Sequence, residues 1–372
     1  MRIDGKLRIG IIFGGRSGEH EVSLSSARSV LDALDIRKYH ITEIGINKVG
    51  GWLVGENVWE VFQEGDISSL TPATLLPIPG RSVLYTLKSD EIGEVMQVFS
   101  ELDVVFPVLH GTFGEDGTLQ GLLEMANLAY VGAGVLGSSV GMDKGVFKDV
   151  MRANHIPVVE SEIVLRSEIE EDIKAVVARG EAMAPYPLFT KPANMGSSVG
   201  INKCKSAQDL KTGLKDAARY DRRILIERGV NAREIELSVL GNDDPKTSLP
   251  GEIRPTAEFY SYEAKYHDDT SELLIPAPIS SAETKHIQEL AIRAFKAIDC
   301  AGMARADFML DKETGEVYLN EVNTIPGFTP ISMYPKLWEA SGLPYPELID
   351  ELIELALERR ADRDKTEWCF ER

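Results

Sequence analysis

Short apolar runs alternate with amphipathic segments in the first third of the chain. Residues 8–13 form an apolar run that leads into a glycine-rich turn, and a helical pattern follows over 23–34. Apolar runs over 39–46 and 102–109 predict two further strands. Because strands that alternate with helices build parallel sheets, residues 1–133 are predicted to form a Rossmann-like α/β domain. The segment 64–89, rich in proline, serine and threonine, has no clear assignment.

A stretch of small residues at 132–139 is interpreted as the junction to a second domain. Beyond it, the pattern predicts helices over 143–154, 167–179 and 206–219 and strands over 187–191 and 224–227. A third domain is predicted to contain a strand at 234–240, a helix from Ser280 to Asp299 with a capping box, and an amphipathic helix around 345–360. The predicted fold class is α/β, in part α+β, with domains over 1–133, 134–226 and 227–372.

One predicted hairpin carries oxygen-bearing side chains at a defined spacing. Its apolar runs 304–310 and 318–323 flank a turn. Glu321 and Asn323 are two residues apart and so share one face of a strand, and a turn near Thr314 places Asp307 opposite Glu321. Such ligands suit Mg²⁺ or Mn²⁺, whose shell is completed by water and phosphate oxygens. We interpret the hairpin as a metal–nucleotide site with Arg305 on the same face; a solvated hairpin face is the alternative.

The segment after this hairpin is a Pro-Gly loop. It reads Thr-Ile-Pro-Gly-Phe-Thr over 324–329 and is followed by Ser332. Such a loop presents free backbone N–H groups beside the predicted metal site, and loops at strand ends often carry chemistry.

Two lysines bracket the second domain and are candidates for phosphate binding. Lys144 opens a predicted helix, where backbone N–H groups favour an anion. Lys191 ends a strand and leads into the Gly-Ser loop 194–200, whose N–H and O–H groups suit a lid over phosphate oxygens. An ordinary surface turn has the same composition, and no P-loop motif occurs in the chain. The segment Glu227–Val230 with Glu234 suits a nucleotide base and ribose; the alternative is solvated charge.

Two loops of the first domain and one of the third are further candidates. Glu19 lies near a helix start, where it is either a dipole-favoured acid or the partner of a substrate ammonium. His110, in the glycine-rich loop 107–117, is either structural or in contact with substrate. The segment 259–267 holds three tyrosines and a lysine and is predicted to be a packed Ω-type loop over the site.

Composition narrows the classes of function. The formal charge of −19 argues against nucleic acid or an anionic membrane surface as the main partner, because both need a basic footprint. The three cysteines have neither zinc-site nor disulfide-framework spacing, which indicates a reducing compartment. No apolar run reaches the length of a signal or membrane-spanning segment, so a cytoplasmic protein is predicted.

Several segments, in this order, resemble motifs of the D-alanine–D-alanine ligases, members of the ATP-grasp superfamily: GGRSGEHEVS, LHGTFGEDGTLQG, MDK, KPANMGSSVG, EAKY, RADF and NEVNTIPGFTPIS. The resemblance extends from Gly14 to Pro335. It implies a three-domain ATP-grasp architecture and an enzyme that joins two D-alanines through D-alanyl phosphate, giving ADP and phosphate, for peptidoglycan precursor synthesis. It also implies a homodimer.

The resemblance implies roles in nucleotide and metal binding. Asp307, Glu321 and Asn323 would bind two Mg²⁺ or Mn²⁺ ions that bridge the phosphates of ATP. Lys144, Lys191 and Lys265 would neutralise phosphate charge. Glu227, Val230 and Glu234 would contact adenine and ribose.

The resemblance also implies roles around the two amino acids. Glu19 would hold the ammonium of the first D-alanine, with His110 nearby. Ser197 would link the lid to Glu19 and Tyr266 through hydrogen bonds. Arg305 and the Gly327 N–H would form an oxyanion site, and Ser332 would bind the carboxylate of the second D-alanine.

Two other functions remain open at this point. The first is an ATP-grasp ligase of different specificity, for D-lactate or D-serine; by the same resemblance, Tyr266 favours an amino acid over D-lactate as second substrate. The second is a non-enzymatic nucleotide sensor, against which the presence of Arg305 together with the three metal ligands argues.

Overall fold

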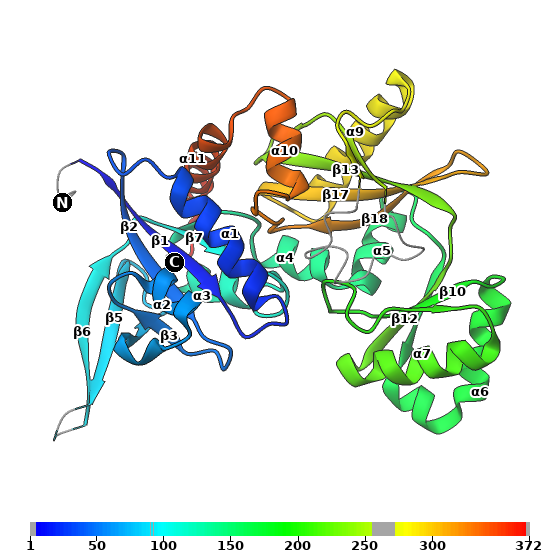
Figure 1. The fold of residues 1–372 in the computed structure, drawn as a ribbon, viewed down its shortest axis with the longest axis horizontal. Helices are drawn as coiled ribbons and strands as arrows, with labels where there is room; N and C mark the ends of the chain where they lie inside the picture. The colour runs from blue at the N-terminus through cyan, green and yellow to red at the C-terminus, as the bar shows by residue number, and fades with distance from the viewer. Residues whose placement is uncertain (1–4, 90, 92, 255–271, 370–372) are drawn as a thin grey trace.

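The computed structural model describes residues 5–89, 91, 93–254 and 272–369 and arranges them around three β-sheets. Figure 1 shows the first sheet at one end of the molecule and the other two sheets at the opposite end. The mixed α/β class predicted from the sequence is therefore confirmed. Of the helices in the described part of the chain, none combines the length and apolar character that a membrane span requires.

The first sheet has the strand order β6-β5-β4-β3-β2-β1-β7-β8. The strands are β1 (Leu7–Gly14), β2 (Tyr39–Ile46), β3 (Trp52–Val54), β4 (Thr71–Leu75), β5 (Val83–Ser89), β6 (Glu94–Glu101), β7 (Val104–Val108) and β8 (Ala129–Tyr130). β1 runs parallel to β2 and β7, as predicted for a Rossmann-like domain, whereas β2 to β6 form an antiparallel extension. The unassigned segment 64–89 supplies the 3₁₀ helix η1 (Ile67–Ser69), β4 and β5 of this extension.

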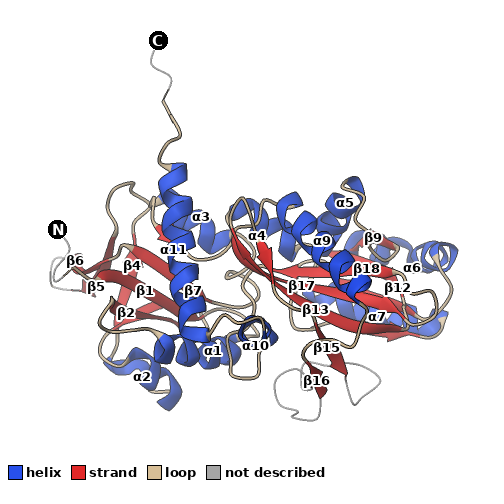
Figure 2. Ribbon diagram, turned by 90° about the horizontal axis from the view of Figure 1, so that it is seen from above, coloured by secondary structure: helices blue, strands red, loops and turns tan. Residues whose placement is uncertain are grey.

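Helices from both ends of the chain cover the first sheet. α1 (His20–Ala33), α2 (Val58–Glu64) and α3 (Thr118–Met125) come from its own connections. The last helix, α11 (Tyr345–Arg363), joins the same apolar core through Leu348, Ile349 and Leu352. Figure 2 shows α11 beside β7, in agreement with their contacts. Residues far beyond 133 therefore complete the core of the first sheet.

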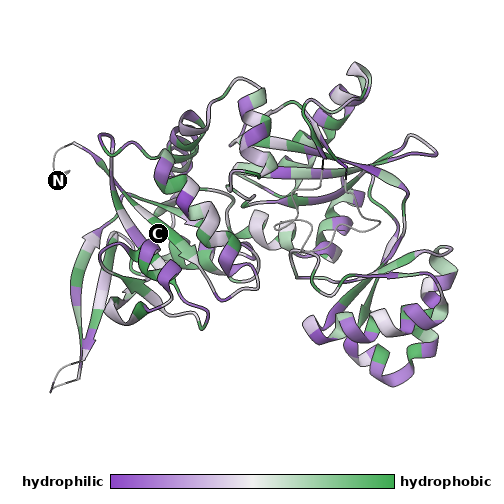
Figure 3. Ribbon diagram, in the orientation of Figure 1, coloured by the Kyte–Doolittle hydropathy of each residue, from purple (hydrophilic) through white to green (hydrophobic). Residues whose placement is uncertain are grey.

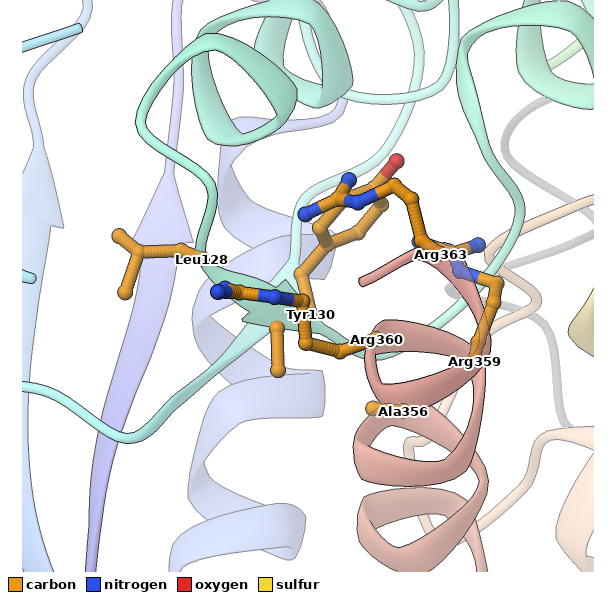
Figure 4. Close-up of a pocket in the computed structure, with 7 residues that line it drawn as sticks. Leu128, Tyr130, Ala356, Arg359, Arg360 and Arg363 are labelled. Carbon is orange, nitrogen blue, oxygen red and sulfur yellow. The ribbon is translucent and has the colours of Figure 1, made fainter. Parts of the chain in front are cut away.

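Arginines at the end of α11 fasten this helix to β8, as Figure 4 shows. The Arg359 guanidinium lies 4.2 Å from the centre of the Tyr130 ring and donates to the Gly132 carbonyl oxygen at 2.6 Å. Arg363 donates to Asn127 at 2.8 Å, and Arg360 pairs with Asp364 at 2.9 Å. The arginines that line the small cavity between these side chains thus already have partners in the protein, and their role is to hold α11 against β8.

The second sheet has the order β11-β10-β12-β9, with all neighbours antiparallel. Its strands are β9 (Ser161–Leu165), β10 (Leu188–Pro192), β11 (Asn202–Cys204) and β12 (Arg223–Arg228). Two helices, α6 (Arg166–Met183) and α7 (Ala207–Tyr220), pack on it. Figure 3 shows hydrophilic and hydrophobic bands alternating along both helices, as expected where one face meets the sheet.

The third sheet has the order β16-β15-β13-β17-β18, with β14 paired to β13. Its strands are β13 (Ala232–Gly241), β14 (Lys246–Thr247), β15 (Gly251–Arg254), β16 (Glu272–Leu274), β17 (Gly302–Asp311) and β18 (Val317–Asn323). Its helices are α4 (Val135–Met142), α5 (Lys144–Ala153), α9 (Ser281–Ala297) and α10 (Met333–Ala340). Phe147 and Met151 of α5 belong to the core of this sheet, although they fall in the range 134–226 assigned to the second domain. The division at 133 and 226 stays a prediction.

The two faces of β17 differ in polarity because side chains alternate along a strand. Ala304, Ala306 and Phe308 face the core beneath α9. Arg305 and Asp307 point to the other face, where β13 contributes Glu236 at the position paired with Asp307. The third sheet thus presents a polar face formed by β17 and its two antiparallel neighbours, β13 and β18.

Candidate active site

Glu19 lies where the first domain meets the Gly-Ser loop. It directly precedes α1, is 8% exposed, and accepts a hydrogen bond from Ser197 Oγ. A Cβ atom on Gly111 would lie 2.5 Å from Glu19 Oε2, and one on Gly196 would lie 2.7 Å from the same oxygen. Only glycine allows this close approach, so three separate loops converge on one carboxylate.

His110 and Glu115 lie under the same loops. The two His110 ring nitrogens contact Ser26 Oγ at 3.0 Å and the Ile325 carbonyl oxygen at 3.2 Å. Burial lowers the pKa of His110, so its imidazole is neutral. Glu115 accepts from the Gly111 N–H at 2.6 Å, and burial together with the nearby charge of Glu19 raises its pKa to about 8. His110 is therefore used in protein contacts through both nitrogens.

The Gly-Ser loop is tied to the start of α5. Lys144, the first residue of this helix, donates from Nζ to the Met195 carbonyl oxygen at 2.6 Å. Asp143 caps the helix by accepting from Val146 N at 2.9 Å. Ser197 and Ser198 both have positive φ, 50° and 60°, a strained left-handed conformation typical of functional loops.

Glu227 lies in a buried cluster of charges at the end of β12. Its carboxylate pairs with Lys191 Nζ at 2.5 Å and with Lys148 Nζ at 2.6 Å. Burial alone would raise the pKa of Glu227, but the two ammonium groups outweigh it and hold the pKa at about 2. Lys191 and Glu227, both predicted to bind ATP, are thus direct partners. Val230 follows in the half-buried turn before β13, and Glu234 lies on β13.

The polar face of the third sheet brings the predicted metal ligands together. The predicted pairing of Asp307 with Glu321 is confirmed, with a β-bulge directly after Asp307. Asn323 Nδ2 donates to Asp307 Oδ2 at 3.0 Å. Arg305 pairs with Asp307 at 2.6 Å and with Glu236 at 2.9 Å. Burial works against the Arg305 charge, but these carboxylates keep its pKa well above the ordinary value.

The Pro-Gly loop connects this face to α10. A Cβ atom on Gly327 would lie 2.7 Å from Ser332 Oγ, so the two predicted substrate-binding groups are neighbours. The Ser332 hydroxyl accepts from the Thr329 N–H at 3.0 Å and contacts its hydroxyl at 2.7 Å. Lys265 and Tyr266 lie outside the described residues, so their predicted roles stay predictions.

Comparison with known proteins identifies the family to which the chain belongs. The family model described as D-ala D-ala ligase N-terminus matches residues 8–133, and the one described as D-ala D-ala ligase C-terminus matches residues 150–354. The chain belongs to the D-alanine–D-alanine ligase family.

Individual ligases align with nearly the whole chain. A D-alanine–D-alanine ligase from Natranaerobius thermophilus is 48% identical over 366 residues, which are 98% of this chain and 99% of that protein. The solved ligase from Coxiella burnetii is 40% identical, covers 97% of both chains and has a TM-score of 0.81. A solved D-Ala:D-Ser ligase from Enterococcus faecalis is 35% identical, covers 94% of this chain and 99% of its own, and has a TM-score of 0.83.

Members of this ligase family use ATP and a divalent metal, and the residues of the polar face fit such an ion. Within the described ranges no three His, Cys, Asp or Glu side chains group together as a metal site. The candidate set is instead Asp307, Glu321 and the Asn323 amide, which are hard oxygen ligands for a cation that keeps water or phosphate in its shell. Hydrogen bonds from Arg305 and Asn323 hold the Asp307 carboxylate in this set.

Sequence reasoning missed four residues that contact groups of the candidate site: Ser26, Glu115, Lys148 and Glu236. Lys148 lies four residues after Lys144 on the same helix, a spacing that places both on one face. Glu236 lies two residues after Glu234 on β13, so strand alternation was the available signal. For Ser26 and Glu115 no such signal exists, since their partners are more than 80 and 200 residues away.

Proposed function

We propose that this chain is an ADP-forming ligase that joins two D-alanines to D-alanyl-D-alanine for peptidoglycan precursor synthesis. The observation that carries the proposal is the hydrogen bond from Ser197 to Glu19, which joins residues 178 apart in sequence. This bond joins the Gly-Ser loop to a carboxylate suited to a substrate ammonium, and it supports the proposal that the loop is a lid over the site. Membership of the ligase family supplies the reaction.

In the first step, the carboxylate of the first D-alanine attacks the γ-phosphorus of ATP. The bond from this phosphorus to the bridging oxygen breaks, and ADP leaves. We assign the ammonium of this D-alanine to Glu19, with His110 nearby, and the phosphates to Lys144, Lys191 and Lys265. Adenine and ribose are assigned to Glu227, Val230 and Glu234. The positive charges of the three lysines reduce the repulsion between the two anionic reactants, ATP and the D-alanine carboxylate.

In the second step, the neutral amine of the second D-alanine attacks the carbonyl carbon of D-alanyl phosphate. The C–N bond forms, and collapse of the tetrahedral intermediate expels phosphate, which leaves as HPO₄²⁻ with the proton that the amine loses. We assign stabilisation of the oxyanion to Arg305 and the Gly327 N–H, and binding of the second carboxylate to Ser332. The lid, through Ser197, and Tyr266 exclude water from the acyl phosphate.

We assign the divalent metal to Asp307, Glu321 and Asn323 and propose two ions, Mg²⁺ or Mn²⁺. When bound, they neutralise the phosphate oxygens and orient the transferred group. The polar face supports this assignment because its oxygens lie on neighbouring strands in direct register.

The test measures phosphate release from ATP and Mg²⁺ with D-alanine, L-alanine, D-serine or D-lactate, and identifies the product by mass. D-alanine-dependent release together with a D-alanyl-D-alanine mass is expected. ATP binding without D-alanine-dependent release would favour the nucleotide sensor. A dominant mixed product with D-serine or D-lactate would favour the other specificity, whereas the relative from Natranaerobius thermophilus is a D-alanine–D-alanine ligase.

We also infer a homodimer in the cytoplasm. The exposed apolar side chains of the edge strand β6, Val95, Met96, Val98 and Phe99, support self-association. The three free thiols support a reducing compartment. Light scattering coupled to size exclusion tests the dimer, and a monomer mass at micromolar concentration would contradict it.

A further inference from the structure

The loop that carries Gly327 is anchored at both ends by side chains of the first domain. At Ile325, the backbone N–H donates to Glu115 Oε1 at 3.4 Å, and the carbonyl oxygen lies 3.2 Å from His110 Nδ1. At Phe328, the backbone N–H donates to Ser26 Oγ at 3.3 Å. Gly327 therefore lies between two anchored peptide groups.

The hydrogen bonds at these anchors have only one consistent direction. A carbonyl oxygen only accepts, so His110 Nδ1 carries the proton that is donated to Ile325. Because the imidazole is neutral, Nε2 accepts from the Ser26 hydroxyl at 3.0 Å, and the Ser26 oxygen in turn accepts from Phe328. Hydrogen bonds thus link Phe328 to Ser26, Ser26 to His110, and His110 to Ile325. The backbone from Ile325 to Phe328, which includes Gly327, closes the ring.

Glu115 connects this ring to the ammonium side of the site. One of its oxygens accepts from Ile325 and the other from the Gly111 N–H. Gly111 is the residue whose Cα lies against Glu19. Both partners of Glu115 are N–H donors, so each of its oxygens acts as an acceptor, whereas the NH2 group of a glutamine would turn a donor toward one of them.

We propose that Ser26, His110 and Glu115 are positioning residues that fix the Gly327 N–H for the aminolysis step, an inference that rests on the proposed function. They act through the backbone of Ile325 and Phe328. An oxyanion donor must lie about 2.7–3.1 Å from the developing charge. A displacement of about 1 Å costs roughly a hundredfold in rate.

A misplaced Gly327 has a specific consequence, because it slows aminolysis after the acyl phosphate has formed. Water then attacks D-alanyl phosphate and returns D-alanine and phosphate. ADP is formed in that turnover without dipeptide. The ratio of ADP to dipeptide therefore reports the positioning of the loop, and it does not depend on the fraction of folded enzyme.

The experiment measures this ratio for wild type, Ser26→Ala, Glu115→Gln and Asp116→Asn. Ser26→Ala opens the ring at Phe328, and Glu115→Gln disturbs Ile325. Asp116→Asn is the matched control, since Asp116 is in the same loop but accepts from Phe113 and Thr118 only within that loop. The ratio is expected to rise at least about threefold in both test variants, with a fall in kcat of about tenfold to a hundredfold, and to stay at the wild-type value in the control.

The outcomes separate this inference from the proposed function. A wild type that forms no dipeptide overturns the proposed function. A wild type with a ratio near one, together with test variants that keep this ratio while kcat falls, overturns the positioning role alone. Two test variants are used in case one of them does not fold, because the ratio of ADP to dipeptide measured for either variant as soluble protein decides whether the positioning role holds.

Discussion

Arg305 and Lys191 each pair with carboxylates of the candidate site, so each positive charge fixes the geometry of its partners and is also proposed to contact substrate. The Arg305 guanidinium bridges Glu236 and Asp307, and Lys191 shares Glu227 with Lys148. Buried charges persist only when they are paired in this way. Replacing one member therefore changes both the chemistry and the orientation of its partners.

Arg305→Ala is expected to lower kcat by about 10²–10³, the usual loss for one oxyanion donor. The KM for ATP is expected to change much less, because the proposed adenine and phosphate residues remain. Steady-state kinetics with both substrates varied give the two constants. Arg254→Ala, which removes a half-exposed arginine from the same sheet, is the control. Equal losses in kcat and in ATP affinity would contradict the oxyanion role.

Lys148→Met is expected to raise the KM for ATP and to reduce the free energy of unfolding at pH 7. The loss should be smaller than about 3–5 kcal/mol, the cost of an uncompensated buried charge, because Lys191 still pairs with Glu227. Glu227 has a lowered pKa in the folded state, so its contribution is complete above its ordinary value of 4.5 and is lost as the pH falls toward about 2. The deficit of the variant should therefore shrink between pH 4.5 and 2. Urea unfolding at a series of pH values measures it, and a deficit that is constant with pH would refute the ion pair.

At the scale of elements, helices and strands with a regular apolar pattern could be predicted from the sequence. Elements without such a pattern, such as α4 and β6, could not. β2 lies at its predicted bounds, β17 follows a period of two, and the Ser280 capping box starts α9 as predicted. α4 was missed because Gly and Ser disfavour helices, and its packing against β18 outweighs that preference. β6 was missed because most of its residues are exposed, so no buried face marks it.

The residues of the candidate site also fall into those that could be grouped from the sequence and those that could not. Asp307, Glu321 and Asn323 could be grouped from the sequence because strand register is a local rule. The contacts of Glu115 and Ser26 with Ile325 and Phe328 could not, since they depend on how the first sheet meets the third. No local sequence pattern predicts how the first and third sheets pack against each other.

The start of α5 gives a prediction at the element scale. Asp143 caps this helix and also pairs with Arg223, and the next residue, Lys144, contacts the lid. Asp143→Ala is expected to cost about 1 kcal/mol in stability, as for other lost N-caps, and to raise the KM for ATP as Lys144 loses its position. Thermal unfolding and kinetics measure the two effects. Ser206→Ala, which removes the N-cap of α7, is the control for loss of a cap alone, and an equal rise in KM there would contradict the link to the lid.

At the scale of the whole molecule, the proposed site draws on all three sheets. Glu19 comes from the first, Lys191 and Ser197 from the second, and Asp307 from the third. A ligand that contacts all of them stabilises the folded chain as a unit, by RT ln(1 + [L]/Kd). Stabilisation by ATP should therefore depend on the metal that connects its phosphates to the third sheet.

ATP with Mg²⁺ at a hundred times its Kd is expected to stabilise the protein by about 2.7 kcal/mol, and chelation of the metal by EDTA to remove most of this effect. The reason is that ATP without a metal brings its negative charge against Asp307 and Glu321, two carboxylates on neighbouring strands. Thermal unfolding with ATP, ATP–Mg²⁺ and ATP–EDTA measures the shift in Tm. Asp307→Asn with Glu321→Gln should lose the Mg²⁺-dependent part, whereas Glu313→Gln, in the exposed turn of the same hairpin, should keep it. A shift of the same size with EDTA would show that stabilisation by ATP does not depend on a metal, which would contradict the assignment of the ion to Asp307 and Glu321, because repulsion from these carboxylates should then weaken ATP binding.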